Sequence, residues 1–300
     1  MRRALVAGGG GFLGAAAAAA LRRRGWKVLA ARRSDADLAD ARQARRLLER
    51  WRPALIVHAA GATGAMDWGR AWDAHVATTL GLLDAVSALK LPARLVVAGS
   101  AAEYGAAAGN SPVREDCPLA PTSVYGASKR SQTLAALSCR DIPVVVARIF
   151  NSCGPGCPEG LVPGAFVRQL ADIARGRRPP VLEVGNLSSS RDFLDARDIA
   201  AALAALGKDS VAPGIYNVCS GTATPIRSLL DRLIALCGLP VELRQVAVQR
   251  QSGDVRSVVG DPSKLRRATG WRPRIALDES LRDAIKALPS NNMDTLEARA

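Results

Sequence analysis

Three polar side chains have the types and spacing needed to move a proton beside a hydride. Tyr125 and Lys129 stand four residues apart in Tyr-Gly-Ala-Ser-Lys, so on a helix they share one face. An ammonium beside a phenol stabilises the phenolate, which lowers the pKa of the tyrosine toward neutrality and suits it to general acid or base catalysis. Ser100 could hydrogen-bond the same reacting oxygen. Because Tyr-x-x-x-Lys also occurs by chance on solvated helices, its meaning depends on its context.

The first residues supply part of that context. A short apolar strand runs into four consecutive glycines, Gly8 to Gly11, and Gly14 follows at the start of an alanine-rich helix. This order is typical of a dinucleotide site, because glycines let the backbone approach the pyrophosphate and the helix N-terminus faces it. Two registers fit, Gly8-x-x-Gly11-x-x-Gly14 and Gly9-x-Gly11-x-x-Gly14, and the sequence leaves both open. A secretory signal is disfavoured, because the glycines and the arginines at 22–24 interrupt the apolar stretch.

Strand and helix signals alternate through the first half, and the buried strands are continuous apolar runs. This pattern predicts an α/β fold with a doubly wound parallel sheet of the Rossmann type. We expect strands at 3–7, 27–31, 54–59, 94–99 and 143–149, with helices at 14–24, 41–50, 70–89 and 125–139. After a loop at 151–163, we expect helices at 164–175, at 225–237 and at 262–269, a helix capped by Asp198 that ends near 206, and strands at 181–184, 215–218 and 241–246.

The order of these elements predicts that the chain folds into two structural parts. Residues 1–150, with a returning segment at about 192–220, should form the dinucleotide-binding Rossmann domain. Residues 151–191 and 221–288 should form a smaller substrate-binding lobe, and residues 289–300 a frayed tail.

Composition narrows the classes of partner. The formal charge is +14, which favours an anionic partner such as nucleic acid, a membrane surface or a phosphorylated small molecule. The arginines form no long basic run and only 4% of residues are aromatic, so nucleic acid is disfavoured. No uncharged apolar run approaches the roughly 18 residues of a membrane span, so no membrane partner is expected.

Six cysteines and two histidines offer no spacing suited to a zinc site, and we expect no metal. Without a secretion signal, the cysteines should be reduced thiols of a cytoplasmic protein and mostly buried. Cys153 and Cys157 flank a Gly-Pro-Gly turn that we expect beside the active site.

The end of the second strand bears on the choice of cofactor. Arg32 and Arg33 stand where an acidic residue usually meets a free ribose 2′-hydroxyl, whereas a 2′-phosphate is met by arginine. NADP(H) is therefore favoured over NAD(H), although both arginines could be solvated loop charges. Asp37 and Leu38 would suit the adenine edge.

Four segments form a combination more specific than any one of them. They are the glycine turn, Ser100-Ala101-Ala102-Glu103-Tyr104-Gly105, Tyr125-x-x-x-Lys129, and Arg148-Ile149-Phe150-Asn151-x-x-Gly154-Pro155-Gly156. Together they resemble the extended short-chain dehydrogenases/reductases of the NAD-dependent epimerase/dehydratase family, which act on nucleotide sugars. Val57-His58-Ala59-Ala60 fits the family's turn beside the cofactor, which implies a positional role for His58. The chain departs from the family at His75, where the family has asparagine.

The second half is similar to the GDP-4-keto-6-deoxy-mannose reductases within that family. The similar segments include Arg191-Asp192-Phe193-Leu194-Asp195-Ala196-Arg197-Asp198 and Tyr216-Asn217-Val218-Cys219-Ser220-Gly221. The resemblance implies that Asn151 and Arg191 contact the substrate diphosphate. A further phosphate-binding arginine is usual before an aspartate matching Asp254; Gln251 holds that place here, and Arg250 is its neighbour.

The resemblance implies the roles of the site. NADPH delivers hydride to a sugar ketone, Tyr125 donates the proton, Ser100 hydrogen-bonds the same oxygen, and Lys129 holds the nicotinamide ribose. The expected cofactor contacts are Gly8, Gly11, Phe12, Leu13, Gly14, Arg32, Arg33, Asp37, Leu38, Ala59, Ala60, Tyr125 and Lys129. The expected contacts of a nucleotide-diphosphate sugar are Ser100, Glu103, Tyr125, Asn151, Arg191 and Arg250. The family also implies a homodimer through the helices at about 70–89 and 125–139.

Several alternatives stay open. The family's 4,6-dehydratases have an Asp-Glu pair where this chain has Ala101-Ala102, so dehydration is disfavoured. A 4-epimerase that retains NAD shares the same three catalytic groups and ranks second. A dinucleotide-sensing or interaction protein without turnover ranks below both. Glu103 could approach the sugar or could be a structural carboxylate.

Overall fold

The computed structural model describes residues 2–64, 66–109, 112–246 and 256–287. Its centre is a six-stranded sheet in the order β10-β5-β4-β3-β1-β2, and every neighbouring pair is parallel. The strands are β1 (Arg3–Ala7), β2 (Lys27–Ala31), β3 (Leu55–His58), β4 (Arg94–Ser100), β5 (Val144–Ile149) and β10 (Gly214–Val218). The strand order changes direction at β1, between β2 and β3, and such a switch point forms a ligand crevice at the carboxyl ends of the strands. The predicted doubly wound α/β fold is confirmed.

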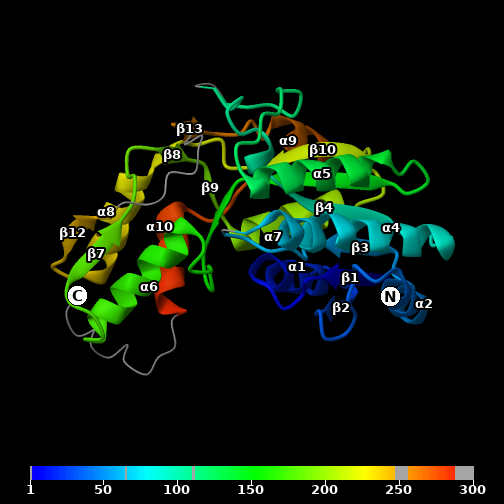
Figure 1. The fold of residues 1–300 in the computed structure, drawn as a ribbon, viewed down its shortest axis with the longest axis horizontal. Coiled ribbons are helices and arrows are strands. Elements are labelled where there is room, and N and C mark those ends of the chain that lie inside the picture. Colours follow the sequence, from blue (N-terminus) through cyan, green and yellow to red (C-terminus); the bar gives the residue numbers. More distant parts are fainter. Residues whose placement is uncertain (1, 65, 110–111, 247–255, 288–300) are drawn as a thin grey trace.

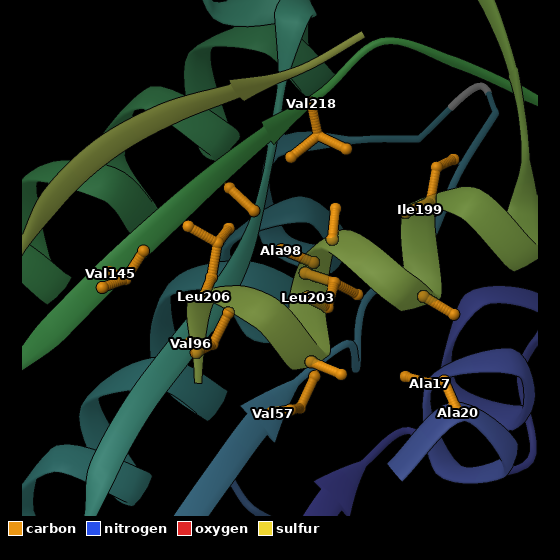
Figure 2. Close-up of a cluster of buried hydrophobic side chains, with 14 of the residues drawn as sticks. Ala17, Ala20, Val57, Val96, Ala98, Val145, Ile199, Leu203, Leu206 and Val218 are labelled. Atoms are coloured by element: carbon orange, nitrogen blue, oxygen red, sulfur yellow. The ribbon is translucent and has the colours of Figure 1, made fainter. Parts of the chain in front are cut away.

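Helices cover both faces of this sheet (Figure 1). One face packs on α1 (Phe12–Arg23) and α7 (Ala196–Leu206), and the other on α2 (Ala41–Trp51), α4 (Thr78–Ala88) and α5 (Val124–Ser138). Figure 2 shows the first of these cores, with Val57, Val96 and Val145 of three neighbouring strands beside Leu203 and Leu206 of α7. Because both faces are buried, the central strands are mainly continuous apolar runs instead of alternating, and their few polar residues, such as Arg148, are buried as well.

A third core lies in the carboxyl-terminal half of the chain and forms a separate group of elements beside the sheet (Figure 1). Its elements are α6 (Val162–Ala174), β7 (Val181–Val184), α8 (Ile226–Cys237), β12 (Glu242–Gln245) and α10 (Leu277–Lys286). Between this core and the sheet, β6 (Asn151–Cys153) pairs with β9 (Phe193–Asp195), while β8 (Ser190–Arg191) lies between β11 (Thr224–Pro225) and β13 (Ser257–Val258). The short helix α9 (Ser263–Thr269) follows. Among the described residues, no helix is long and apolar enough to cross a membrane.

The segment predicted as one helix at 70–89 is three pieces. A short α3 (Trp68–Ala71) leads into a π-helical turn, η1 (Trp72–Ala77), and then into α4. The hydroxyls of Thr78 and Thr79 donate to the carbonyl oxygens of Ala74 and His75, at 2.9 and 2.7 Å. A π turn is a feature that apolar spacing does not reveal, and such turns are frequent at functional sites.

The cap of α7 was also predicted wrongly. Asp195, not Asp198, precedes the helix, and its Oδ1 accepts from the Arg197 N–H at 2.7 Å. Asp198 lies inside the first turn, where its carboxylate accepts from the N–H groups of Arg274 and Ile275, both at 2.9 Å. Both residues are aspartates before an apolar run, so only the contact with a distant segment distinguishes them. The helix α10 was not predicted.

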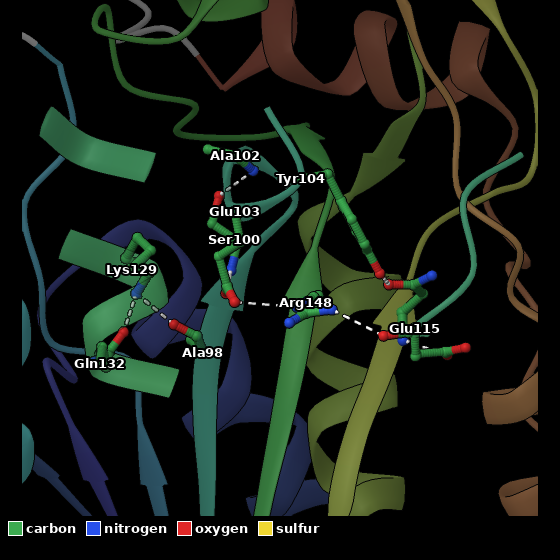
Figure 3. Close-up of polar contacts among 10 residues, drawn as sticks. Ala98, Ser100, Ala102, Glu103, Tyr104, Glu115, Lys129, Gln132 and Arg148 are labelled. Atoms are coloured by element: carbon green, nitrogen blue, oxygen red, sulfur yellow. Dashed lines mark hydrogen bonds and ion pairs between the residues drawn. The ribbon is translucent and has the colours of Figure 1, made fainter. Parts of the chain in front are cut away.

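A buried ion pair joins the end of β4 to β5. Glu103 is 0% exposed and Arg148 is 2% exposed, and Arg148 Nε donates to Glu103 Oε2 at 3.1 Å. The other carboxylate oxygen accepts from the Ser100 N–H at 3.0 Å, and Arg148 also donates to the Glu115 carbonyl at 3.2 Å (Figure 3). The guanidinium lies 4.9 Å from the Tyr104 ring centroid. Each charge therefore has several partners, which a buried pair needs to offset its desolvation.

Replacing one partner of this pair should be costly. We expect Arg148→Met to lower the free energy of unfolding by about 3–5 kcal/mol, because it leaves the Glu103 carboxylate buried and unpaired. The double variant Glu103→Gln/Arg148→Met should be less destabilised, since Gln can still accept from Ser100. The control Arg227→Gln breaks an exposed pair with Asp231 and should cost less than about 1 kcal/mol. Urea denaturation at pH 7 checks this; equal losses for Arg148→Met and Arg227→Gln would contradict it.

Candidate active site

The glycine turn lies where β1 ends, and geometry requires three of its glycines, Gly8, Gly9 and Gly14. Gly8 has a φ of +77°, and a Cβ there would stand 2.6 Å from the Ala60 main chain. A Cβ at Gly14 would stand 2.0 Å from the Gly8 carbonyl oxygen. A Cβ at Gly11 would meet only that same oxygen, at 3.3 Å. The positive φ of Gly8 favours the register Gly8-x-x-Gly11-x-x-Gly14, although a Cβ at Gly9 would also stand 2.6 Å from the Ala30 main chain.

The surroundings of the turn fit a pyrophosphate. Gly11 precedes α1 without a side-chain cap, so the N–H groups of the first turn are available to an anion. Phe12 and Leu13 begin the helix and are half-buried. Ala59 and Ala60 follow β3 beside Gly8, and the Ala59 N–H donates to the Ala7 carbonyl at 3.0 Å.

The end of β2 places its two arginines differently. The Arg32 side chain lies over the glycine turn, since a Cβ on Gly10 would stand 3.2 Å from Arg32 Nε. Arg33 is turned toward Asp37, and the two pair at 3.1 Å. The other Asp37 oxygen accepts from the Ala39 N–H, and the Leu38 side chain is buried in the core. Arg32 is therefore the arginine held against the predicted cofactor site.

Ser100, Tyr125 and Lys129 come together at the carboxyl end of β4. Ser100 is the last residue of β4, and Tyr125 and Lys129 lie in α5. Lys129 is 5% exposed, and its Nζ donates to the Ala98 carbonyl and to Gln132 Oε1, both at 2.5 Å (Figure 3). A side-chain hydrogen bond links Tyr125 and Ser100. An oxygen placed between Ser100 and Tyr125 could thus take a proton from Tyr125 and a hydrogen bond from Ser100.

The pKa of Tyr125 differs from the prediction. Burial raises it, and the charge of Glu103 raises it further, while the hydrogen bond with Ser100 lowers it. Lys129 does not counter this in the structure, because its ammonium is directed at Ala98 and Gln132. The pKa of Lys129 itself is lowered to about 8, mainly by burial. Tyr125 is therefore a protonated phenol near neutrality, which suits a proton donor.

Glu103 does not face an open site. Ser100 caps the 3₁₀ turn η2 (Ala101–Glu103), where its Oγ accepts from the Ala102 N–H at 3.2 Å. Glu103 completes this capping box, because its side chain accepts from the Ser100 N–H, and it is fully buried against Arg148. The structure thus corrects the prediction of Glu103 as a substrate contact and supports its structural alternative. Its carboxylate orients the main chain that carries Ser100.

His75 is a site residue whose role the sequence left undefined. It is 1% exposed, and its ring meets the Tyr125 ring edge-on at a centroid distance of 5.5 Å. Nδ1 lies 2.9 Å from Ser128 Oγ, and Nε2 lies 3.0 Å from the Ala62 carbonyl oxygen and 3.2 Å from the Ala62 N–H. If Nδ1 carries the proton, it donates to Ser128, whose hydroxyl then donates to the Tyr125 carbonyl at 2.8 Å. This tautomer gives the Ala62 N–H an acceptor, whereas an Nε2–H would donate to the Ala62 carbonyl instead, and it links the loop after β3 to the first turn of α5.

The residues expected to bind substrate lie partly within the described structure. The Asn151 N–H and side-chain amide both donate to the Asp192 carbonyl, at 3.0 and 3.4 Å. Arg191 is half-buried on β8 and donates to the Ser190 carbonyl at 2.8 Å. Asn151 and Arg191 are thus brought to one region by the pairing of β6 with β9, whereas Arg250 lies outside the described residues.

The cysteines of the nearby loop are not reactive groups. Burial raises the pKa of the Cys153 thiol to about 12 and that of Cys157 to about 11. Cys153 packs in the third core and Ser280 Oγ lies 3.2 Å from its sulfur. All six cysteines are free, but only Cys153 and Cys219 are fully buried, so the expectation of mostly buried thiols was too strong.

Both histidines should stay neutral in the folded protein, because burial lowers the pKa of His58 to about 3 and that of His75 to about 4. We expect ¹⁵N NMR to show no titration of either ring between pH 5 and 8, with His75 as the Nδ1–H tautomer and His75→Asn used for assignment. Both folded pKa values lie below the ordinary 6.5, so stability should fall as pH decreases from 6.5 toward 4. A titration midpoint above pH 6 for either ring would contradict this burial argument.

Known proteins with similar sequences include a family model and several nucleotide-sugar enzymes. The model of the NAD dependent epimerase/dehydratase family matches residues 4–219. The chain is 32% identical over 238 residues to GDP-6-deoxy-D-mannose reductase of Pseudomonas aeruginosa, covering 77% of this chain and 78% of the relative. It is 32% identical over 253 residues to dTDP-6-deoxy-L-talose 4-dehydrogenase (NAD(P)(+)) of Kitasatospora kifunensis, covering 83% and 80%.

The structure resembles that of RMD from Pseudomonas aeruginosa complexed with NADPH, with a TM-score of 0.86 and 30% identity over 100% of both chains. The family model covers most of the chain, and two relatives above 30% identity extend over more than two thirds of it. The chain therefore belongs to the NAD-dependent epimerase/dehydratase family, within the extended short-chain dehydrogenases/reductases, and is an NAD(P)-dependent enzyme.

Proposed function

We propose that the protein is an NADPH-dependent reductase of a nucleotide-diphosphate 4-keto-6-deoxy sugar, of the type that converts GDP-4-keto-6-deoxy-mannose to GDP-rhamnose. The observation that carries the proposal is the meeting of Ser100, Tyr125 and Lys129 at the carboxyl end of β4, on the edge of the sheet where the glycine turn also lies. The similarity to GDP-6-deoxy-D-mannose reductase supports the substrate class.

The residues after Ser100 support reduction over dehydration. Elimination of water needs an acid and a base near the sugar, and the two positions after Ser100 are Ala101 and Ala102. The next carboxylate, Glu103, is fully buried in its pair with Arg148. Neither a proton acceptor nor a second donor is therefore offered from this turn.

The glycine turn and Arg32 support the cofactor. The uncapped start of α1 would hold the pyrophosphate, and Arg32, which lies over Gly10, would meet the 2′-phosphate of NADP(H). When bound, NADPH supplies the hydride that reduces the ketone carbon.

Each catalytic side chain has a role that follows from its surroundings. Tyr125, whose pKa is raised by burial, would donate its proton to the ketone oxygen as negative charge develops there. Ser100 would hydrogen-bond the same oxygen. Lys129 uses two of its three N–H groups on Ala98 and Gln132, which leaves one for the nicotinamide ribose.

The third core and its connections would form the sugar-nucleotide side of the site. We propose that Asn151 and Arg191 contact the diphosphate, because an amide and a guanidinium both suit phosphate oxygens. Arg250 is proposed as a further contact on sequence grounds alone. Residues 151–191 and 221–288 would thus act as the substrate-binding lobe.

The activity is tested by incubating the protein with GDP-4-keto-6-deoxy-mannose and NADPH or NADH while following absorbance at 340 nm. We expect oxidation of NADPH, and we expect Tyr125→Phe to reduce kcat by about 10²-fold or more because the proton donor is lost. The affinity for NADPH should stay nearly unchanged. The matched control is Tyr216→Phe on β10. This change removes a hydroxyl that donates to the Ala212 carbonyl, and it should keep kcat close to the wild-type value.

Two outcomes would contradict the reductase. Substantial activity of Tyr125→Phe would remove Tyr125 from proton transfer. Absence of oxidation with either cofactor, together with interconversion of UDP-sugars under tightly bound NAD, would favour the 4-epimerase, which uses the same three catalytic groups.

The choice of cofactor is tested at the end of β2. We expect Arg32→Gln to weaken NADPH binding about tenfold or more, because a charged contact to the 2′-phosphate is lost, while NADH binding changes little. Arg33→Gln is the matched comparison and should have a smaller effect, since that guanidinium is paired with Asp37. Calorimetric titration with both cofactors measures this. An equal loss for NADPH and NADH in Arg32→Gln would contradict the assignment.

We further propose a homodimer formed through α4 and α5, and a cytoplasmic location. Leu80 on α4 is 39% exposed and Leu134 on α5 is 61% exposed, and exposed apolar residues on two neighbouring helices support a helical interface. The six free thiols are compatible with a reducing compartment.

A further inference from the structure

Behind Lys129, on the side away from Ser100, lies a buried amide that sequence reasoning did not single out. Gln132 follows Lys129 by three residues on α5, is 0% exposed, and accepts from Lys129 Nζ at 2.5 Å (Figure 3). Residues three apart on a helix are neighbours. The ammonium is therefore held between this side-chain carbonyl and the Ala98 main-chain carbonyl.

A chain of hydrogen bonds fixes which way the Gln132 amide points. Gln132 Nε2 donates to Thr79 Oγ1 at 2.9 Å, and the Thr79 hydroxyl donates its own proton to the His75 carbonyl at 2.7 Å. His58 Nε2 also lies 2.9 Å from Thr79 Oγ1. Since the single Thr79 proton is already used, His58 must be the donor in that contact. With both lone pairs of Thr79 occupied, the Gln132 amide nitrogen faces Thr79 and its oxygen faces Lys129.

We propose that Gln132 is a positioning residue that holds the Lys129 ammonium in place and in its charged form. The proposal depends on the proposed function only in taking Lys129 as the lysine that binds the nicotinamide ribose. Gln132, Thr79 and His58 come from α5, α4 and β3, so three elements converge on this one side chain.

The charges around Lys129 show why an oriented neutral acceptor matters. Burial lowers the pKa of Lys129 to about 8, and Glu103, the one opposite charge that raises it, is already paired with Arg148. The other titratable groups that face it are His58, His75 and Tyr125, and none of them offers a negative charge near neutrality. Hydrogen bonds to a charged group favour the charged form. The hydrogen bonds to the carbonyl groups of Ala98 and Gln132 therefore stabilise the protonated form of Lys129.

The test follows the Lys129 pKa in two variants with opposite expected signs. Gln132→Leu removes the acceptor and should lower the pKa by about one unit, whereas Gln132→Glu adds a negative charge and should raise it by about one unit. The probe is the NMR titration of ¹³C-labelled lysine, with the Lys129 signal assigned by its absence in Lys129→Met. The matched control is Gln169→Leu, which loses an exposed amide pair with the Glu183 main chain and should leave the Lys129 titration unchanged.

A purely structural role would not produce opposite shifts. If the activity assay succeeds, the pH dependence of kcat/KM for the two Gln132 variants should move in the same directions as the NMR midpoints, and the KM for NADPH should rise in Gln132→Leu. If either Gln132 variant fails to fold, Thr79→Val, which removes the hydroxyl that orients the amide, should still lower the Lys129 midpoint.

The outcomes separate the two proposals. Midpoints that stay within experimental error of the wild type in Gln132→Leu and Thr79→Val would overturn the role of Gln132. Opposite shifts in a protein that shows no NADPH oxidation would support Gln132 and contradict the reductase.

Discussion

The buried ion pair between Glu103 and Arg148 is the contact on which the site depends. It crosses from the turn after β4 to β5, and its second carboxylate oxygen holds the Ser100 N–H. Burying both charges is unfavourable unless each is fully hydrogen-bonded, which favours the conformation of the turn in which Ser100 caps it. The same guanidinium lies against Tyr104, whose hydroxyl donates to Asn217 Oδ1 on β10 at 2.7 Å. Three neighbouring strands are thereby tied to the position of the Ser100 hydroxyl.

On the other side of Ser100, neutral groups do the positioning. Lys129 is buried without a carboxylate of its own, and its surroundings consist of oriented carbonyls, a threonine hydroxyl and two neutral histidines. A low-dielectric environment strengthens each of these hydrogen bonds, but it also makes any missing partner costly. The π-helical turn η1 contributes to this arrangement, because it places His75 beside Tyr125 and leads into α4, whose second residue is Thr79. Burial, together with the charge of Glu103, raises the pKa of Tyr125 and keeps its phenol protonated.

Much of the fold was predictable because its signals are local. Apolar runs marked β1 to β5 and β10 within one residue at most ends, and the glycine turn identified the crevice at the switch point. Several of the predictions that failed involve contacts between distant segments. From the sequence, Asp195 and Asp198 are equivalent candidates for the helix cap. The structure distinguishes them, because the N–H groups of residues 274 and 275 donate to the Asp198 carboxylate. The sequence allows Glu103 to face the sugar, whereas the structure buries it in an ion pair with Arg148. The pKa of Tyr125 depends on burial, which sequence spacing does not reveal.

By itself, the sequence determined the class of fold and named the candidate reacting groups. Both are encoded by neighbours along the chain: alternating apolar segments, glycines that tolerate close approach, and a tyrosine and lysine one helical turn apart. Only the tertiary structure decided which arginine lies over the glycine turn, which carboxylate is structural, and which amide faces Lys129. Those choices depend on hydrogen-bond partners and solvent access supplied by elements far apart in sequence, and the energy of a buried polar group is set by these partners rather than by its own type.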